Sequence, residues 1–516
     1  MRLATCSAFA ALASVVVACS GVPDEALGDE TSDALESGTL TIHADQVVAT
    51  SFEGFGTQYN QNLFATISQQ DGVTPARLET LEKKLGALSA GYVRIFFDAG
   101  APKDEQDSFL RTVALAQKLG AHVNVTYWHG PYKDVPAQMK VFADALQGVL
   151  ASPGSVDVTI QNEVNTTPCV TQDVYASLYV ALDGELRGRS LRSRVRFIGG
   201  DLLRGGVSSD EPEAFQSRVD KCVKGCGWTP AQCADKAQSD GSTQEAWLAD
   251  FASRTVQGVP GATYVSDMFE GYSAHVYWNY WDRNKMTVRL DGLQKAIDAL
   301  PARARKPLYI TEFGAKGDYS KVASPGVYDG TRPATDADGH TFLASEGYPI
   351  ADTAIEGFQT GRFAVEALKR GVVAALRWDA FDAHYQTAPM GDFSMLKKAS
   401  TEWTATPSFP VMQLLDEAAP RGWKVVGVDG DQRVGLVAAA LADGGSGRSL
   451  FVVNDTAAVQ KLVMRGFAKD ATLRVLQWTR ADETTRTVRT MKSGALGGVT
   501  VDVPIHAVVV VTSLKG

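Results

Sequence analysis

Basic residues are too few in this 516-residue chain to outweigh its acidic ones. Fifty Lys and Arg residues stand against 59 Asp and Glu, which gives a formal net charge of −9 at pH 7, and no segment concentrates positive charge. Nucleic-acid binding needs a basic patch or stripe, so we expect no nucleic-acid partner. The charged fraction of 21% and the hydrophobic fraction of 45% are ordinary for a globular protein with a large core.

After its first 20 residues the chain also lacks any apolar run long enough to span a bilayer, and no internal repeat is apparent. The apolar stretch 3–18 follows Arg2 and is too short for a transmembrane helix, which is typical of a secretory signal. It ends in VVACS (16–20), which resembles the bacterial lipoprotein signal. The resemblance implies that 1–18 is removed and that Cys19 is acylated; an ordinary secretory signal cut nearby is the alternative.

Segment 19–38 contains no Lys or Arg, although it carries six acidic residues. Low hydrophobicity combined with charge of one sign predicts a disordered tether. We therefore expect an exported protein, either an envelope lipoprotein at the cell surface or in the periplasm, or a secreted one. Cys19 would supply its only attachment to a membrane, and we expect the chain to be a monomer.

Cysteine is scarce, with six residues in the whole chain. Cys6 falls in the signal and Cys19 is the expected lipid site, so four cysteines remain. Outside the cytoplasm, four cysteines predict two disulfides, for which three pairings are possible. A zinc site is the alternative, but no histidine lies within the cluster. The four residues are Cys169, Cys222, Cys226 and Cys233.

Between residues 51 and 419, short β-branched runs alternate with amphipathic stretches, as in βα units around a parallel sheet. A doubly wound open sheet would carry a Gly-rich phosphate turn after its first strand, and EGFGTQYN (53–60) lacks a convincing one. The sequence therefore predicts a (β/α)8 TIM barrel. Predicted strands are 51–58, 91–97, 121–128, 156–163, 194–201, 271–278, 306–313 and 374–381, and predicted helices include 75–88, 107–119, 136–150, 171–187 and 353–370.

The pattern of the sequence changes at about residue 420. Short strand-like runs spaced about ten residues apart, with Gly, Asp and Asn between them, predict an antiparallel β-sandwich over 420–516. The segment 39–50, before the barrel, is also strand-like, and it could join that sandwich.

Two of the predicted barrel strands end in a glutamate. The fourth ends in Asn162 and Glu163, and the seventh ends in Glu312. Barrel enzymes place catalytic groups at the C-terminal ends of strands, and the fourth and seventh strands lie on opposite sides of an eight-stranded ring. A facing pair of carboxyl groups is what glycosidic hydrolysis requires, one protonated to assist the leaving group and one ionised to attack the anomeric carbon.

The segments IQNEVN (160–165) and YITEFG (309–314) resemble the signatures of glycoside hydrolase clan A. With the C-terminal sandwich, the chain looks closest to families 30 and 39, and the residues around the two glutamates resemble those of family 5. The resemblance implies retaining hydrolysis of a β-linkage, with Glu163 as acid/base and Glu312 as nucleophile. A tethered enzyme with aromatic loops suits a polysaccharide or oligosaccharide.

The same resemblance implies roles for further residues at the strand ends. Asn162 would bind the sugar 2-hydroxyl, and Arg94 would keep Glu312 ionised by charge pairing. Tyr277 would donate to the nucleophile, His275 would line the sugar site, and Trp378 would form a platform for a sugar ring. Each has a structural alternative, because an arginine, histidine or aromatic residue in a strand can equally be a packed core residue.

Aromatic clusters follow two of the strands, in TYWHGPY (126–132) and YWNYW (277–281). Flat rings stack on the apolar faces of sugars while their polar edges reach hydrogen-bond partners. We therefore expect Trp128, His129 and Trp278 to contact the substrate, although each could lie in the core.

Two long segments, 205–243 and 316–348, are expected as loops over the active face that shape specificity. The first carries three of the cysteines and could be stapled to Cys169, just after the acid/base. We expect no metal and no other cofactor, since substrate hydrogen bonding is a simpler role than metal ligation for Asp379 and Asp382, with His384 nearby.

Two other functions remain as alternatives to hydrolysis. The same carboxylates would serve a transglycosylase that remodels an envelope glycan, and a barrel without catalysis would serve as a carbohydrate-binding surface lipoprotein. The sequence leaves open the sugar, the linkage, endo or exo action, the family and the oligomeric state.

Overall fold

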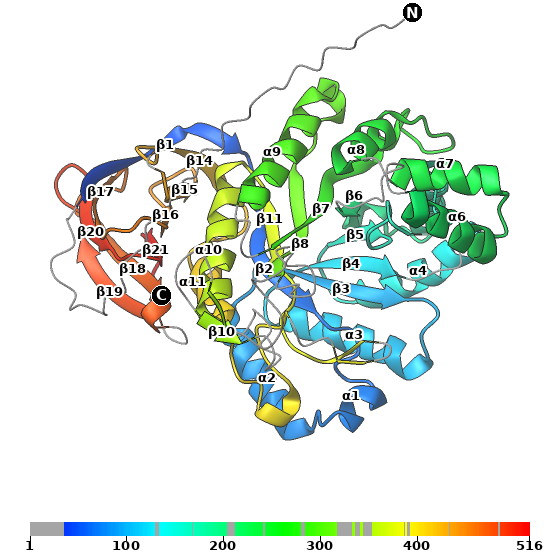
Figure 1. The fold of residues 1–516 in the computed structure, drawn as a ribbon, viewed down its shortest axis with the longest axis horizontal. Coiled ribbons are helices and arrows are strands. Elements are labelled where there is room, and N and C mark those ends of the chain that lie inside the picture. Colours follow the sequence, from blue (N-terminus) through cyan, green and yellow to red (C-terminus); the bar gives the residue numbers. More distant parts are fainter. Residues whose placement is uncertain are drawn as a thin grey trace, which may run out of the picture. The chain divides into compact units, whose positions relative to one another are not determined.

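Runs of β-branched and aromatic residues form the strands of a closed parallel barrel in the computed structural model (Figure 1). The structure describes residues 36–128, 134–167, 169–203, 212–240, 243–279, 284–316, 333–335, 341–343, 353–385, 388–389, 393–432, 434–482 and 486–515. The eight barrel strands follow one another in chain order, which confirms the predicted TIM barrel. They are β2 (Gly54–Tyr59), β3 (Tyr92–Asp98), β4 (His122–Trp128), β5 (Val156–Ile160), β6 (Val195–Leu203), β7 (Phe269–Asn279), β8 (Leu308–Lys316) and β11 (Ala374–Arg377).

Helices with one apolar face pack around the barrel, and polar side chains define where several begin. Thr74, Thr171 and Thr353 each accept a hydrogen bond from a backbone N–H in the first turn, which satisfies one of the unpaired donors there. The helices are α1 (Thr66–Gln70), α2 (Pro75–Leu88), α3 (Lys103–Lys118), α4 (Val135–Val149), α5 (Gln172–Gly188), α6 (Pro212–Cys226), α7 (Pro230–Asp240), α8 (Gln244–Ser253), α9 (Asn284–Ala299), α10 (Ala354–Lys369) and α11 (Ser408–Glu417).

Shorter elements connect these helices and strands. Two small antiparallel ladders form in the long connections after β8 and β11. Within the described part of the chain, no helix is both long and apolar enough to cross a lipid bilayer. The ladders pair β9 (Pro333–Thr335) with β10 (Thr341–Leu343) and β12 (His384–Tyr385) with β13 (Ala388–Pro389), and 3-10 helices lie at Arg192–Arg194, Val265–Met268, Ala302–Ala304, Ala399–Thr401 and Arg480–Asp482.

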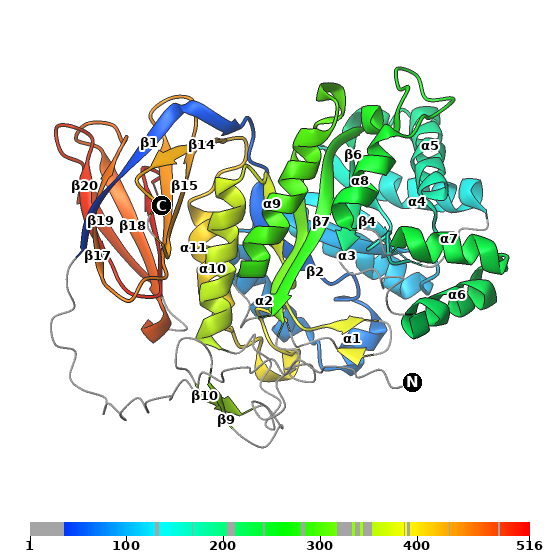
Figure 2. The same ribbon diagram turned by 45° about the horizontal axis from the view of Figure 1, so that its top comes forward.

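The second layer of the fold is a nine-stranded sheet, almost entirely antiparallel (Figure 2). β1 lies inside it, antiparallel to β14 and parallel to β17. Strands from both ends of the order share one apolar core, so the sheet folds over on itself as a sandwich. The order is β19 (Thr487–Lys492), β18 (Thr472–Thr479), β21 (Ala507–Thr512), β16 (Arg448–Asn454), β15 (Leu436–Ala442), β14 (Lys424–Asp429), β1 (Glu36–Ala49), β17 (Gln460–Arg465) and β20 (Val499–Val503).

Helix α10 connects the barrel to this sheet. The buried apolar residues of α10 pack in the main core together with apolar residues of β15 and β16. Two ion pairs accompany the apolar contact, Arg362 with Asp455 and Lys369 with Asp431, the latter at 2.5 Å. The main core of the barrel therefore extends onto one face of the sheet, while the interior of the sandwich is a separate apolar cluster.

The structure corrects two of the sequence-based expectations. β5 ends at Ile160, so Asn162 and Glu163 lie in the turn that follows the strand and not in it. Gln161 and Glu163 have positive φ angles of 64° and 50°, a conformation that interrupts strand pairing. The segment 205–243, expected as a loop, contains α6 and α7. Each of these helices begins with a proline, which fits the first helical position.

Two disulfides form among the four cysteines predicted to pair. Cys169 is bonded to Cys226 and Cys222 to Cys233. The first bond fastens the α6–α7 hairpin to the segment that follows β5, and the second closes the hairpin on itself. All four cysteines are therefore disulfide-bonded, which rules out the zinc alternative for these residues.

Candidate active site

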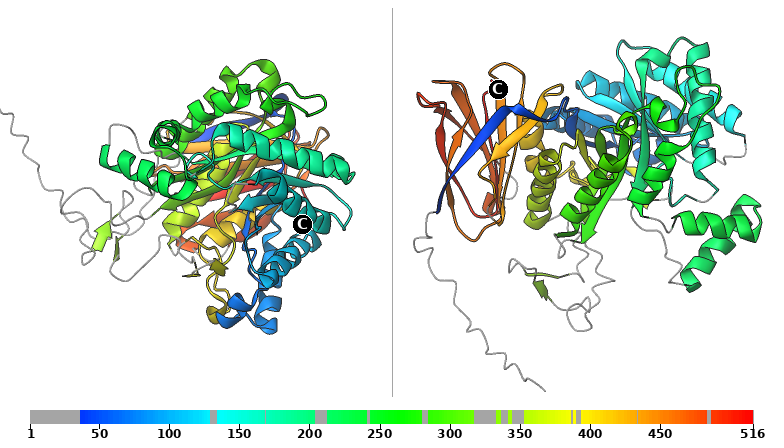
Figure 3. Two further views of the ribbon diagram at one scale, coloured as in Figure 1. Left: turned by 90° about the vertical axis from the view of Figure 1, so that its right-hand side faces the viewer. Right: turned by 90° about the horizontal axis from the view of Figure 1, so that it is seen from above.

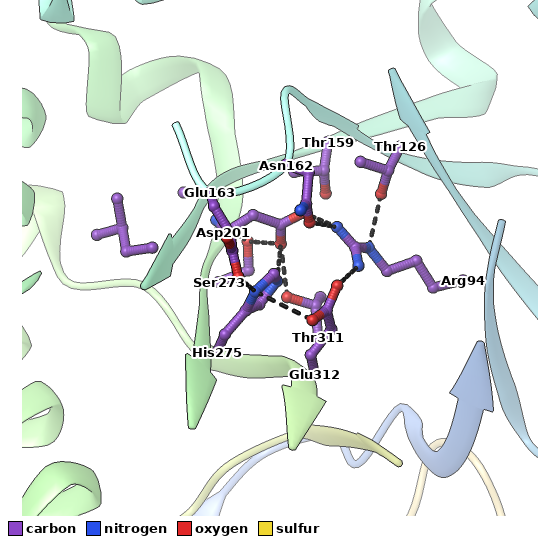
Figure 4. Close-up of polar contacts among 12 residues, drawn as sticks. Arg94, Thr126, Thr159, Asn162, Glu163, Asp201, Ser273, His275, Thr311 and Glu312 are labelled. Atoms are coloured by element: carbon purple, nitrogen blue, oxygen red, sulfur yellow. Dashed lines mark hydrogen bonds and ion pairs between the residues drawn. The ribbon is translucent and has the colours of Figure 1, made fainter. Parts of the chain in front are cut away.

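The barrel brings the two predicted glutamates together at one end of its strands (Figure 4). Glu312 lies within β8, and the neighbouring strand β7 pairs His275 with it in register. An irregularity of that register falls directly before His275, and a second one in β6 spans Asp201. Bulges of this kind re-aim side chains next to active sites; His275 contacts Glu312, and Asp201 contacts Arg94.

Three side chains converge on the carboxylate of Glu312. Arg94 of β3 forms an ion pair and hydrogen bond with one oxygen. The Tyr277 hydroxyl donates a 2.7 Å hydrogen bond to the other, and Nδ1 of His275 lies 3.3 Å from that same oxygen. The carboxylate is almost entirely buried. One guanidinium and one phenol therefore stabilise a negative charge that burial alone would disfavour.

Glu163 faces Glu312 across the barrel mouth. Its side chain is 27% exposed, much more than that of Glu312, and one oxygen lies 3.2 Å from Nδ1 of His275. A carboxylate oxygen of Glu163 and one of Glu312 lie within 4.8 Å of each other. The two carboxyl groups are thus bridged by one imidazole nitrogen, and they differ in their access to solvent.

Arg94 is the centre of the polar network beneath the glutamates. Its guanidinium also forms an ion pair with Asp201 and donates a 2.7 Å hydrogen bond to Oδ1 of Asn162. Nε donates to the Thr126 hydroxyl at 2.8 Å, and Nη1 to the amide oxygen of Gln58 at 3.0 Å. With five acceptors around it, the guanidinium is held in one orientation.

Asp201 is a site residue that the sequence reasoning missed. Its side chain is fully buried and accepts hydrogen bonds from the hydroxyls of Ser273 and Thr311. Burial by itself would raise the pKa of Asp201, but the charges of Arg94 and His275 outweigh it and hold the pKa below its usual range. The signal was present in the sequence, because the predicted strand 194–201 also ends on this acidic residue.

His275 carries a strongly raised pKa. Burial would lower the pKa of this imidazole, but the negative charges of Glu312 and Asp201 and the hydrogen bond to Glu163 raise it to about 9. At neutral pH the ring is therefore charged, and both of its nitrogens carry protons. Nδ1–H points between the two glutamates, and Nε2 lies 3.8 Å from Asp201.

Aromatic side chains line the barrel mouth beside this network. Trp378, Tyr277 and Phe96 form an apolar cluster separate from the main core, and Trp128 packs against it. Phe96 stacks on Trp128 with ring centres 4.8 Å apart, a contact that the sequence reasoning did not anticipate. His129, also expected to bind substrate, lies outside the described residues.

Trp278 is not part of this cluster, which corrects the expectation for that residue. It is 2% exposed, stacks on Phe363 of α10 and donates a 2.5 Å hydrogen bond to Gln359. Side chains alternate along a strand, so when His275 and Tyr277 face the barrel mouth, Trp278 faces the surrounding helices. It belongs to the core between β7 and α10.

Glu163, His275 and Glu312 offer three atoms close enough together to ligate a metal ion. The neighbouring charges oppose this use of the site. The guanidinium of Arg94 contacts Glu312 directly, and His275 must lose a proton of raised pKa before it can act as a ligand. The chemistry of the three residues fits proton transfer and nucleophilic attack better than metal binding.

Comparisons with known proteins place the fold among glycoside hydrolases. The sequence matches no protein-family model and no curated protein sequence. The structure is similar to the catalytic domain of family 30 xylanase C from Talaromyces cellulolyticus, with a TM-score of 0.59, 11% identity, and 92% of this chain and 99% of that chain covered.

Two further solved structures show a similar relationship. An endo-β1,6-glucanase aligns with a TM-score of 0.56 and 11% identity over 94% of this chain and 95% of its own. A family 51 α-L-arabinofuranosidase from Thermotoga petrophila aligns with a TM-score of 0.56 and 11% identity over 93% of this chain and 100% of its own. At these identities the similarity shows a shared fold, the barrel with its β-sandwich of families 30 and 51.

Proposed function

We propose that this protein is a retaining glycoside hydrolase in which Glu163 is the acid/base and Glu312 the nucleophile. The observation that carries the proposal is the approach of their carboxylate oxygens to within 4.8 Å. Retaining enzymes hold the two carboxyl groups about 5–5.5 Å apart, whereas inverting enzymes leave roughly 6.5–9.5 Å for a water molecule. An approach this close fits the separation found in retaining enzymes, in which the ionised carboxylate attacks the sugar itself.

The surroundings of each carboxyl group support this division of roles. Arg94 places a positive charge and Tyr277 a hydroxyl donor against the carboxylate of Glu312, which suits an anionic nucleophile. Glu163 is the more exposed of the two, so it can exchange a proton with water or with a leaving group. Nδ1–H of His275 lies within reach of both glutamates, so the charged ring stabilises the carboxylate of Glu163 after Glu163 has given its proton to the leaving group.

The first step forms a covalent intermediate. An oxygen of Glu312 attacks the anomeric carbon, the bond from that carbon to the leaving oxygen breaks, and Glu163 donates its proton to the departing oxygen. In the second step Glu163 removes a proton from water, the water oxygen attacks the anomeric carbon, and Glu312 leaves as a carboxylate. Two inversions at one carbon give overall retention.

Several neighbours are placed to bind the sugar. Arg94 holds Oδ1 of Asn162, which leaves the amide nitrogen oriented to donate to a sugar hydroxyl. Trp128 is partly exposed and offers an aromatic face for a sugar ring, beside Trp378, which is 8% exposed. These positions suit a chain of several sugars, so we infer a β-linked polysaccharide or oligosaccharide as substrate.

A panel of polysaccharides tests the proposal. It would include xylan, β-1,6-glucan, β-1,4-glucan and arabinan, because proteins of similar fold are named for acting on xylan, glucans or arabinofuranosides. Cleavage by the wild-type protein, with none by Glu312→Ala, is expected for one polymer. Cleavage that survives in Glu312→Ala, or a wild-type protein that cuts none of an extended panel of plant, fungal, algal and bacterial glycans, would contradict it.

We further infer that the protein is exported and anchored through a lipid on Cys19. The sequence VVACS (16–20) and the two disulfides support this inference, since disulfides persist in oxidising compartments. Mass spectrometry of the mature N-terminus should find a lipidated Cys19, and Cys19→Ser should move the protein from the membrane fraction to the soluble fraction. An unmodified cysteine at that position would contradict it.

A further inference from the structure

A second pocket lies apart from the glutamates, between the α6–α7 hairpin and the start of α5. It has a volume of about 480 Å³, and its lining includes Trp228, Gln232 and Thr171. This volume is within the usual range of small-ligand sites. We propose that the pocket is a carbohydrate-binding site that holds another part of the glycan whose hydrolysis is proposed above. The proposal rests on that function for the identity of the ligand.

The disulfide between Cys169 and Cys226 builds this pocket. It holds the two Cα atoms 5.3 Å apart, and the residues two positions further on in each segment, Thr171 and Trp228, both line the hollow. The hairpin follows the C-terminal end of β6, and Glu163 and Glu312 also lie at the C-terminal ends of their strands. Figure 3 shows the hairpin at the periphery of the barrel. Cys169 itself follows Glu163 by only six positions, so a glycan could contact both sites.

Trp228 supplies the aromatic surface that a sugar ring needs. One side of the residue packs against the small apolar core of the hairpin, around Cys222 and Cys233, and the residue remains partly exposed toward the pocket. A ring fixed on one face and open on the other loses little conformational freedom when a sugar stacks on it. Stacking on such faces is a common mode of carbohydrate binding.

The polar lining has the composition of a sugar site. Arg254 forms ion pairs with Asp173 and Asp250, the latter at 2.9 Å, so its guanidinium is already oriented before a ligand arrives. Guanidinium, carboxylate and amide groups can each bind two neighbouring hydroxyls at once. Lys236, which is 5% exposed, and the amide of Gln232 complete the set.

The balance of charge favours a neutral glycan over an anion. The lining includes Lys236, Arg254 and Asp173, and Arg254 is already paired with Asp173 and with Asp250 beside the pocket. An anionic ligand would have to compete with these carboxylates for Arg254. A neutral sugar can bind the ion pair of Arg254 and Asp173 without separating it.

Binding and catalysis can be measured separately to test this site. Affinity electrophoresis of the full-length Glu312→Gln protein in gels containing xylan or β-1,6-glucan would report binding without turnover. Adding Trp228→Ala should weaken retention of the protein by the retarding polymer about tenfold, and Trp228→Phe should restore most of it. Lys221→Ala, on the same hairpin but outside this pocket, is the matched control and should change nothing.

Kinetics of the otherwise wild-type protein complete the test. Trp228→Ala should raise KM for the polymer while kcat/KM for an aryl glycoside stays unchanged, which also shows that the variant is folded. Unchanged retention in the polymer gels, equal losses on polymer and aryl glycoside, or no retardation of the parent protein by any polymer would each overturn the second site. A wild-type protein that cleaves no glycan would instead contradict the proposed function, whereas cleavage with Trp228→Ala unaffected would contradict only this inference.

Discussion

Arg94 and Asp201 form an ion pair in which both side chains are completely buried, one layer below the two glutamates. The pair fixes Nη2 of Arg94, and the same guanidinium presents Nη1 to Glu312. Without Asp201 the buried guanidinium would lose one of the two carboxylates that balance its charge and the acceptor that holds Nη2 on the side away from Glu312. Asp201 therefore acts through Arg94 as a positioning residue for the nucleophile.

Asp201→Asn is expected to cost about 3–5 kcal/mol of the free energy of unfolding, the range for breaking a buried ion pair. It should also lower kcat/KM, because the contact of Arg94 with Asp201 that helps to place Nη1 on Glu312 is weakened. Asp183→Asn is a matched control: Asp183 is a buried aspartate of α5 that pairs at 2.6 Å with Arg187 of the same helix and with Arg192 of the 3-10 helix that follows. Urea unfolding should show a loss for both variants, and a normal kcat/KM for Asp201→Asn would refute the positioning role.

Glu163→Gln should affect substrates according to their leaving groups. A natural glycoside needs a proton on its leaving oxygen, so we expect a loss of about 10²–10⁴ in kcat/KM. An activated aryl glycoside leaves without a proton and should be slowed far less in the glycosylation step. Steady-state and burst kinetics on both substrates measure the difference, and equal losses on the two would count against Glu163 as the acid.

Tyr277→Phe removes only the hydroxyl that donates to Glu312. A hydrogen bond to a charged group contributes roughly 1.5–3 kcal/mol, so kcat/KM should fall about 10- to 100-fold while the ring stays in place. Tyr272→Phe is the control, since its hydroxyl donates a 2.8 Å hydrogen bond to the carbonyl of Ala304 outside the site. If both variants retain full activity, Tyr277 does not support the nucleophile.

The raised pKa of His275 predicts a dependence of stability on pH. The ring has a pKa of about 9 in the folded protein and about 6.5 when unfolded. The folded state therefore binds more protons between these values, and the stabilisation is complete below pH 6.5 and lost as pH rises toward 9. Its size is on the order of 3 kcal/mol.

Urea unfolding at several pH values should show this loss in the wild-type protein and a much smaller one in His275→Gln. His43→Gln, a control in the folded sheet, should lose as much free energy of unfolding between pH 6.5 and 9 as the wild-type protein does. If the free energy of unfolding of His275→Gln falls between pH 6.5 and 9 as steeply as that of the wild type, the imidazole is not charged in the folded state.

The barrel and its two glutamates follow from local sequence patterns, and for that reason they were predictable. Alternation of β-branched runs and amphipathic stretches sets the (β/α)8 order, and strands that end on polar residues point to Glu163 and Glu312. Asp201 also ends a predicted strand, but its importance depends on Arg94, which lies 107 positions earlier in the chain. Only the closed barrel brings these two residues into contact.

The remaining differences between the sequence-based expectations and the structure arise where tertiary packing or backbone conformation determines the position of a side chain. Trp278 belongs to an aromatic cluster in the sequence, yet strand alternation and the contact with α10 place it in the core. Glu163 was expected at the end of a strand, but positive φ angles at Gln161 and Glu163 turn the chain after Ile160. These angles raise the carboxyl group into the barrel mouth, where it is partly exposed instead of buried in the strand.

The central claim is that Glu163 and Glu312 act by double displacement. The most direct test is proton NMR of the anomeric centre during the first minutes of hydrolysis, on the polymer identified by the panel. Retention predicts that the new reducing end first appears in the same anomeric form as the bond that was cut, and that the other anomer grows in later by mutarotation. If the opposite anomer appears first, the protein is an inverting enzyme and Glu312 is not its nucleophile.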